Sequence, residues 1–100
     1  MAHEVIWSPE AVEDVESIGA YIQRDSAHYA QAVVGKIVDV AKTLAEFPQI
    51  GRMVPELEDP SVHECFVYSY RLIYRVESSR VLIVAVVHGR RLLERVSDRF

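Results

Sequence analysis

The sequence predicts an α+β fold in which an N-terminal helical hairpin packs on one face of a small, mainly antiparallel sheet of about four strands. Three observations predict it: a short strand-like run opens the chain, two amphipathic helical segments follow, and three runs rich in β-branched and aromatic residues fill the second half. Because 100 residues can enclose one hydrophobic core but not two, residues 1–100 are expected to form a single domain.

The first strand should span residues 3–7, and it ends at a clear helix start. In Ser8-Pro9-Glu10 the serine hydroxyl can cap the helix, and proline suits the first helical position because it has no amide to satisfy. Apolar residues then recur at intervals of three and four, which predicts one helix from residue 9 to about 24 and another from 26 to about 46. The residues of this stripe are Ala11, Val15, Ile18, Ile22, Ala30, Val33, Ile37, Ala41 and Leu44.

The second half begins with a loop over residues 52–61, and loops of this length in small domains often carry function. Three strands should follow, over 62–68, 70–77 and 80–88, with a hairpin turn at Ser78-Ser79. Residues 94–100 form either a short helix or a frayed end. Four aromatic residues of these strands are expected to serve packing, namely Phe66, Tyr68, Tyr70 and Tyr74.

A two-residue turn at Ser78-Ser79 fixes the pairing of the last two strands, because side chains alternate between the faces of a sheet. It would pair Arg75 with Leu82, Ile73 with Val84 and Arg71 with Val86. One face would then be open, with an apolar centre and basic surroundings, formed by Arg71, Ile73, Arg75, Leu82, Val84, Val86 and His88. The other face would lie under the helices, formed by Leu72, Tyr74, Val76, Val81, Ile83, Ala85 and Val87.

In this register Arg71 and His88 are diagonal neighbours, close enough to converge on one ligand or phosphate. A slip by one residue would bury Arg71 and Arg75, which the cost of an unpaired buried charge opposes. The alternative for both arginines is an ion pair with Glu64, Glu77 or acids of the 52–61 loop. For His88 the alternative is a histidine at the strand edge with no chemical role.

Composition excludes several classes of protein. The net charge of -4 disfavours a nucleic-acid binder, although residues 50–100 hold eight arginines and residues 1–49 carry the acidic excess. The single cysteine, Cys65, excludes an internal disulfide, and the four scattered histidines offer no ligand pair, so neither a metal nor another cofactor is expected. The absence of a leader and of a long apolar run predicts a soluble, cytoplasmic protein without a membrane segment.

Four segments, in this order and spacing, resemble the RelE/ParE superfamily of type II toxin-antitoxin toxins over residues 4–92. They are Trp7-Ser8-Pro9-Glu10-Ala11, Phe47-Pro48-Gln49-Ile50-Gly51-Arg52, Tyr70-Arg71-Leu72-Ile73-Tyr74-Arg75-Val76 and His88-Gly89-Arg90-Arg91. The resemblance implies two helices on an antiparallel sheet. It also implies a hetero-oligomer with a small antitoxin, whose extended or helical segment covers the toxin.

The open sheet face, apolar with arginines at its rim, fits such a partner segment or the toxin's target. The residues expected to bind there are Arg71, Ile73, Arg75, Leu82, Val84, Val86, Arg90 and Arg91.

The resemblance leaves the activity open between two branches. ParE-like members inhibit DNA gyrase, whereas RelE-like members cleave messenger RNA on the ribosome. In the second case Arg71 would stabilise the phosphate, His88 would act as the acid and Glu56 as the base. The acidic charge favours the ParE-like branch. A non-toxic member that only binds a partner is the third interpretation.

Overall fold

The computed structural model describes residues 2–90 and 93–100 and confirms the predicted α+β fold. Its sheet has five strands in the order β1-β5-β4-β3-β2, in which β1 runs parallel to β5 and all other pairs are antiparallel. The elements are β1 (Glu4–Trp7), α1 (Pro9–Gln23), α2 (Ala27–Thr43), β2 (Arg52–Met53), β3 (Val62–Val67), β4 (Tyr70–Val76), β5 (Arg80–His88) and a 3₁₀ helix, η1 (Leu93–Arg99). The strand beyond the expected four is β2, which lies inside the predicted loop and is only two residues long.

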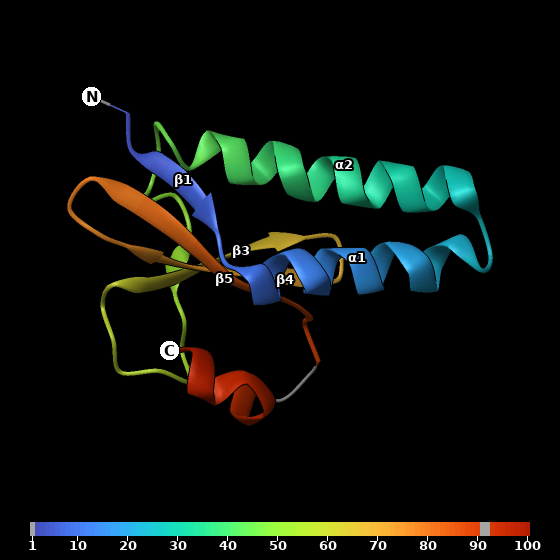
Figure 1. The fold of residues 1–100 in the computed structure, drawn as a ribbon. Coiled ribbons are helices and arrows are strands. Elements are labelled where there is room, and N and C mark those ends of the chain that lie inside the picture. Colours follow the sequence, from blue (N-terminus) through green and yellow to red (C-terminus); the bar gives the residue numbers. More distant parts are fainter. Residues whose placement is uncertain (1, 91–92) are drawn as a thin grey trace.

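The two long helices lie side by side over one face of the sheet (Figure 1). Each begins at the serine that the sequence indicates: the Ser8 hydroxyl accepts a hydrogen bond from the Ala11 amide at 3.1 Å, and Ser26 does the same for Tyr29 at 3.1 Å. Their apolar stripes meet the sheet in one core, which also contains Leu72, Tyr74, Val81, Ile83 and Val86.

The opposite face of the sheet is covered by the chain itself. Val54 from the loop, together with Leu93 and Val96 from η1, packs on a second buried cluster that includes Ile73, Ala85 and Val87. Of the two alternatives for residues 94–100, the short helix is therefore the one observed. The prediction of an open, apolar sheet face is wrong. Three of its members are almost fully buried: Ile73 (0% exposed), Val86 (2%) and Val84 (3%).

A β-bulge in the centre of the sheet changes the predicted pairing. Arg75 lies opposite Leu82 as expected, but beyond Tyr74 and Ile83 the register shifts by one residue, so that Ile73 faces Ala85 and Arg71 faces Val87. The predicted pairs Ile73–Val84 and Arg71–Val86 are therefore wrong. As a result Val86 turns toward the helices, whereas Ala85 and Val87 turn toward the loop and η1.

Hydrogen bonds from Ser8 and α1 satisfy the backbone of β5 beside its irregular stretch. Strand β1 ends at Trp7 opposite Ile83, so the next stretch of β5 has no strand partner on that side. The Ser8 amide donates to the Ile83 carbonyl at 3.0 Å, and the Ser8 hydroxyl donates to the Val84 carbonyl at 3.3 Å. The Val86 amide donates to the Asp14 carboxylate at 3.0 Å. Ser8 and helix α1 thus supply the partners that a longer β1 would have provided.

The C-terminal segment is held beside the same residue of α1. Arg99 donates to the two carboxylate oxygens of Asp14 at 2.6 and 3.3 Å, and to the Val84 carbonyl at 3.4 Å.

Within residues 2–90 and 93–100, no helix has the length and apolar character that crossing a bilayer requires.

Gly51 gives a direct test of packing beneath β3 and β4. A Cβ atom on this residue would lie 2.4 Å from the Glu64 carbonyl oxygen and 2.7 Å from the Tyr74 hydroxyl. Because the Glu64 backbone could move away from this atom only at a cost in strain, we expect Gly51→Ala to lower the free energy of unfolding by about 1–3 kcal/mol in urea titrations. Gly35→Ala is the matched control, because its Cβ would meet nothing within 4 Å. That control should gain up to about 1 kcal/mol as a helical glycine replacement; equal behaviour of the two variants would contradict the packing described.

Candidate functional site

Arg71, the residue singled out for phosphate or partner binding, lies in a cluster of four charges in which Arg71 and Glu64 are buried, whereas Arg52 and Glu56 are partly exposed. Its Nε donates to Glu64 Oε1 at 2.6 Å, while Nη1 and Nη2 donate to the two oxygens of Glu56 at 2.8 and 2.9 Å. Glu64 also accepts a hydrogen bond from Arg52 Nε at 2.6 Å. We call Arg52, Glu56, Glu64 and Arg71 the charged cluster.

The elements position these groups through strand alternation. Glu64 lies on β3 two residues before Phe66, which pairs with Arg71 on β4, so both side chains point to the loop face of the sheet. Glu56 reaches Arg71 from the loop between β2 and β3. Arg71 is therefore buried, at 4% exposure, although the sequence argument placed it on an open face. Burial is tolerated because the guanidinium is paired with two carboxylates, whereas the cost that opposed burial applies to an unpaired charge.

Hydrogen bonds within the charged cluster shift the pKa values of Glu56 and Arg71. The hydrogen bonds from Arg71 lower the pKa of Glu56, and those same bonds raise the pKa of Arg71. Glu56 is therefore a weaker base than an ordinary carboxylate, and both of its oxygens already accept hydrogen bonds from Arg71. The alternative of ion pairing describes both arginines, because Arg75 donates to Asp59 at 3.2 Å.

His88, the predicted acid, lies elsewhere. It ends β5 opposite Tyr70, with the two rings edge to face at a centroid distance of 5.6 Å, and its Nδ1 accepts a hydrogen bond from the Arg90 amide at 3.2 Å. In the predicted register Tyr70 would have faced Val87. The bulge therefore moves His88 by one position, away from the face that carries Arg71.

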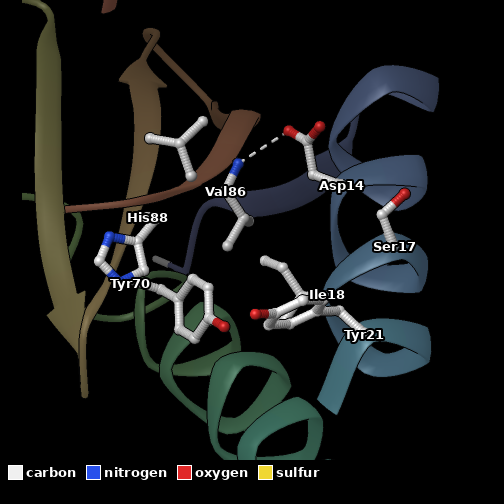
Figure 2. Close-up of a pocket in the computed structure, with 8 residues that line it drawn as sticks. Asp14, Ser17, Ile18, Tyr21, Tyr70, Val86 and His88 are labelled. Atoms are coloured by element: carbon white, nitrogen blue, oxygen red, sulfur yellow. Dashed lines mark hydrogen bonds between the residues drawn. The ribbon is translucent and has the colours of Figure 1, made fainter. Parts of the chain in front are cut away.

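A hollow of about 410 Å³ opens beside His88, between α1 and the ends of β4 and β5. Figure 2 shows Ile18 and Tyr21 of α1 facing Tyr70 and His88 across it, with the Asp14–Val86 hydrogen bond at its edge. Its lining residues are Asp14, Ser17, Ile18, Tyr21, Tyr70, Val86, Val87 and His88. The structure thus brings together two predicted site residues, Val86 and His88, with residues of α1 for which no site role was predicted.

A second hollow, of about 350 Å³, shares Tyr21, Tyr70 and His88 with the first and adds Tyr29 and Tyr68. We call these five residues the tyrosine surface. Tyr68 was expected to serve packing but is 60% exposed, whereas Tyr74 does pack, at 0% exposure. Burial raises the pKa of Tyr74 to about 12. The sequence could have indicated two exposed rings, because Tyr21 and Tyr29 lie outside the apolar stripe on either side of the turn that joins the two helices.

The remaining candidates are scattered. Leu82 is half-buried and Arg90 is exposed, while Arg91 lies outside the described residues. Among residues 2–90 and 93–100, no three or more His, Cys, Asp or Glu side chains group in a way that could hold a metal ion. Burial raises the pKa of the Cys65 thiol.

Replacement of Arg71 tests whether the charged cluster is structural. Arg71→Met leaves Glu64, whose side chain is 0% exposed, with only Arg52, so we expect the free energy of unfolding to fall by about 3–5 kcal/mol. Arg71→Lys should recover little, because an ammonium cannot bridge both carboxylates. Arg75→Met is the matched control and should cost less than about 1 kcal/mol, since its pair with Asp59 is partly exposed. Equal losses in urea titrations for Arg71→Met and Arg75→Met would refute a structural cluster.

Glu56 predicts a pH dependence. Its pKa in the folded protein is below the ordinary value of 4.5, so its stabilising effect is fully present above that value and is lost as the pH falls through the lower folded pKa. The side chain is 49% exposed, and the effect should not exceed about 1 kcal/mol. We expect Glu56→Gln to be less stable than the wild type near neutral pH, with the difference shrinking between about pH 5 and pH 3. A constant difference across that range would exclude the ion pair as its origin.

Comparisons with known proteins agree with this architecture. The family described as ParE toxin of type II toxin-antitoxin system, parDE, matches residues 5–93. A putative toxin, Y4kP of Sinorhizobium fredii, is 39% identical over 46 residues, which cover 46% of this chain and about half of that protein (48%).

Two solved structures are similar in fold. A chromosomal ParDE toxin-antitoxin system from P. aeruginosa superposes with a TM-score of 0.72 at 21% identity, over 87% of this chain and 96% of that one. A mutant of the E. coli toxin RelE in the free state superposes with a TM-score of 0.69 at 17% identity, over 99% and 94%. At such identities these structures support the fold alone. The family match, however, covers most of the sequence, and the chain therefore belongs to the ParE toxin family of type II toxin-antitoxin systems.

Proposed function

We propose that this toxin arrests growth by inhibiting DNA gyrase, as the ParE-like branch does, and that it does not cleave messenger RNA. The observation that carries the proposal is the separation of the residues that cleavage would need. Arg71 and Glu56 are bonded to each other in the charged cluster, while His88 lies against Tyr70 on the other side of the strand pair.

Cleavage of RNA by its own 2'-hydroxyl requires a base, a cation at the phosphate and an acid, all within hydrogen-bond reach of one phosphodiester. Here the Arg71 side chain is only 5% exposed, and its guanidinium already contacts two carboxylates. Its fork is the geometry that would grip a phosphate, so the carboxylates occupy the place of the substrate. Glu56 in turn has no reason to accept a proton near neutral pH, because Arg71 lowers its pKa.

Electrostatics supports the same choice. The charged cluster contains two arginines and two glutamates and so adds no net charge. The whole chain carries -4, whereas a protein that docks on ribosomal RNA gains affinity by neutralising phosphates. A protein target such as gyrase makes no comparable demand for positive charge.

We further propose a cytoplasmic antitoxin as the regular partner, forming a hetero-oligomer with this chain. Structures with the same fold include a ParDE system and the RelBE2 toxin-antitoxin complex of Mycobacterium tuberculosis, which superposes with a TM-score of 0.65 at 21% identity. Since Ile73, Val84 and Val86 are covered by the chain itself, the antitoxin should contact the more accessible members of the predicted set, Arg75, Leu82 and Arg90.

The test separates the two targets directly. The purified toxin should inhibit supercoiling by DNA gyrase, and induction in cells should arrest growth while transcripts stay intact. The double variant His88→Ala, Glu56→Gln should retain growth inhibition, because neither side chain transfers a proton in this proposal.

A ribonuclease would behave differently in the same assays. Loss of a general acid or base costs about 10²- to 10⁴-fold in rate, so the double variant would lose its toxicity. Cleaved transcripts with unaffected supercoiling would overturn the gyrase proposal in favour of the RelE-like activity. A chain that is harmless when induced, with both readouts unchanged, would point to a member that only binds a partner.

A further inference from the structure

We infer that the tyrosine surface, formed by Tyr21, Tyr29, Tyr68, Tyr70 and His88, binds an arginine-bearing peptide segment of another protein. The inference goes beyond the proposed function, because it holds whichever target the toxin has. It rests on how the rings are presented, on the charges around them and on one contact within the chain.

The rings gather at one end of the molecule from four separate elements. Tyr21 ends α1, Tyr29 begins α2, Tyr68 occupies the turn between β3 and β4, and Tyr70 begins β4. Three of them are largely open to solvent, with Tyr21 at 67%, Tyr68 at 60% and Tyr29 at 53% exposure. Tyrosine combines a large apolar face with a hydrogen-bonding hydroxyl at low entropic cost, and for this reason it is enriched where proteins bind other chains.

Backbone strain at Tyr68 strengthens the interpretation. Its φ is 54°, and it is the only non-glycine residue with a positive φ in the described part of the chain. A bulky side chain is unfavourable in this left-handed conformation, where glycine or asparagine would be relaxed. Packing does not explain its presence, since the ring is mostly exposed. Backbone strain that no packing contact compensates is typical of residues that take part in binding.

The aspartates that line the two hollows favour a cationic group. The described residues that line the two hollows include Asp14 and Asp25 but no lysine or arginine. Asp14 is occupied by Arg99 and the Val86 amide, and Ser26 by its capping bond, which leaves Asp25, Ser17, Ser69 and the tyrosine hydroxyls to meet a ligand. Electron-rich rings with a nearby carboxylate attract a cationic group, and they offer little to a phosphate backbone.

One contact within the chain shows that the chemistry fits. The guanidinium carbon of Arg24 lies 6.0 Å from the centre of the Tyr21 ring, at the edge of the tyrosine surface. Arginine suits such a surface better than lysine, because its planar group stacks on rings and donates in several directions at once. A partner's arginine would extend this pairing to Tyr29, Tyr68 and Tyr70.

The experiment titrates the isolated full chain, labelled with ¹⁵N, with an acetylated Gly-Arg-Gly-Arg-Gly amide and follows its backbone amide signals. We expect shifts at the C-terminal end of α1, the start of α2 and the turn at Tyr68. The same peptide with citrulline in place of arginine keeps the shape without the charge and should not bind. Tyr68→Gly should raise the dissociation constant about two- to fivefold, the loss of one exposed cation–π contact, without lowering the thermal midpoint.

Two further variants keep the result interpretable. Tyr29→Ala alters a solvent-facing ring on a helix and should weaken binding by a similar factor. It therefore replaces Tyr68→Gly as the test if that variant disturbs the hairpin. Phe47→Ala is the matched control, because this ring is 58% exposed but lies beyond the other end of α2, and it should bind as the wild type does.

Equal binding of the citrulline peptide, or equal loss in Phe47→Ala, would overturn the proposal. Shifts at the tyrosine surface with a short oligothymidine but none with the arginine peptide would also overturn it, and would assign the surface to nucleic acid.

Discussion

The structure depends on one carboxylate. Asp14 accepts the Val86 amide of the central strand pair and holds Arg99 of the C-terminal helix, so a single side chain of α1 joins three elements that are far apart in sequence. Its position follows from the helix start: Ser8 fixes where α1 begins, and Asp14 then lies beside the stretch of β5 that β1 is too short to reach. An unpaired strand amide in the interior costs about 1–3 kcal/mol, and Asp14 removes that cost.

The distribution of functional groups follows from this contact. With α1 bonded to its backbone, β5 contains one extra residue in its pairing with β4, and every side chain beyond it changes face. Arg71 and His88 would have shared a face in a regular ladder. The bulge instead leaves Arg71 with Glu56 and Glu64 on the loop side and brings His88 beside Tyr70. The register shift in the stretch of β5 that α1 contacts therefore keeps Arg71 and His88 from sharing one face.

The sequence predicted the features that local patterns specify. Helix starts at Ser8 and Ser26 were visible because capping is a property of neighbouring residues, and the hairpin register held as far as Tyr74 because the turn defines it. The bulge was not predictable from local pattern, and the contact beside it joins Val86 to Asp14, 72 residues away. Burial of Arg71 was invisible for the same reason: its partner Glu56 comes from a loop whose path no periodicity describes. The coverage of the second face by η1 was not predictable from local pattern either, because its contact through Arg99 reaches Asp14, 85 residues away.

Self-coverage of the sheet also constrains how a partner can bind. To reach Ile73 or Val87, a partner would have to displace η1, which would expose Leu93 and Val96 at about 1.5–3 kcal/mol each and break the Arg99–Asp14 pair. The tyrosine surface demands no such rearrangement, because Tyr21, Tyr29 and Tyr68 are exposed in the free chain and the hairpin already holds Tyr68 in its strained conformation. Binding to a preformed surface avoids the cost of reorganisation and ordering, which otherwise reduces affinity. The same bonds of Asp14 that close one face of the sheet thus leave the end of the helical hairpin as the region best prepared for contact with another protein.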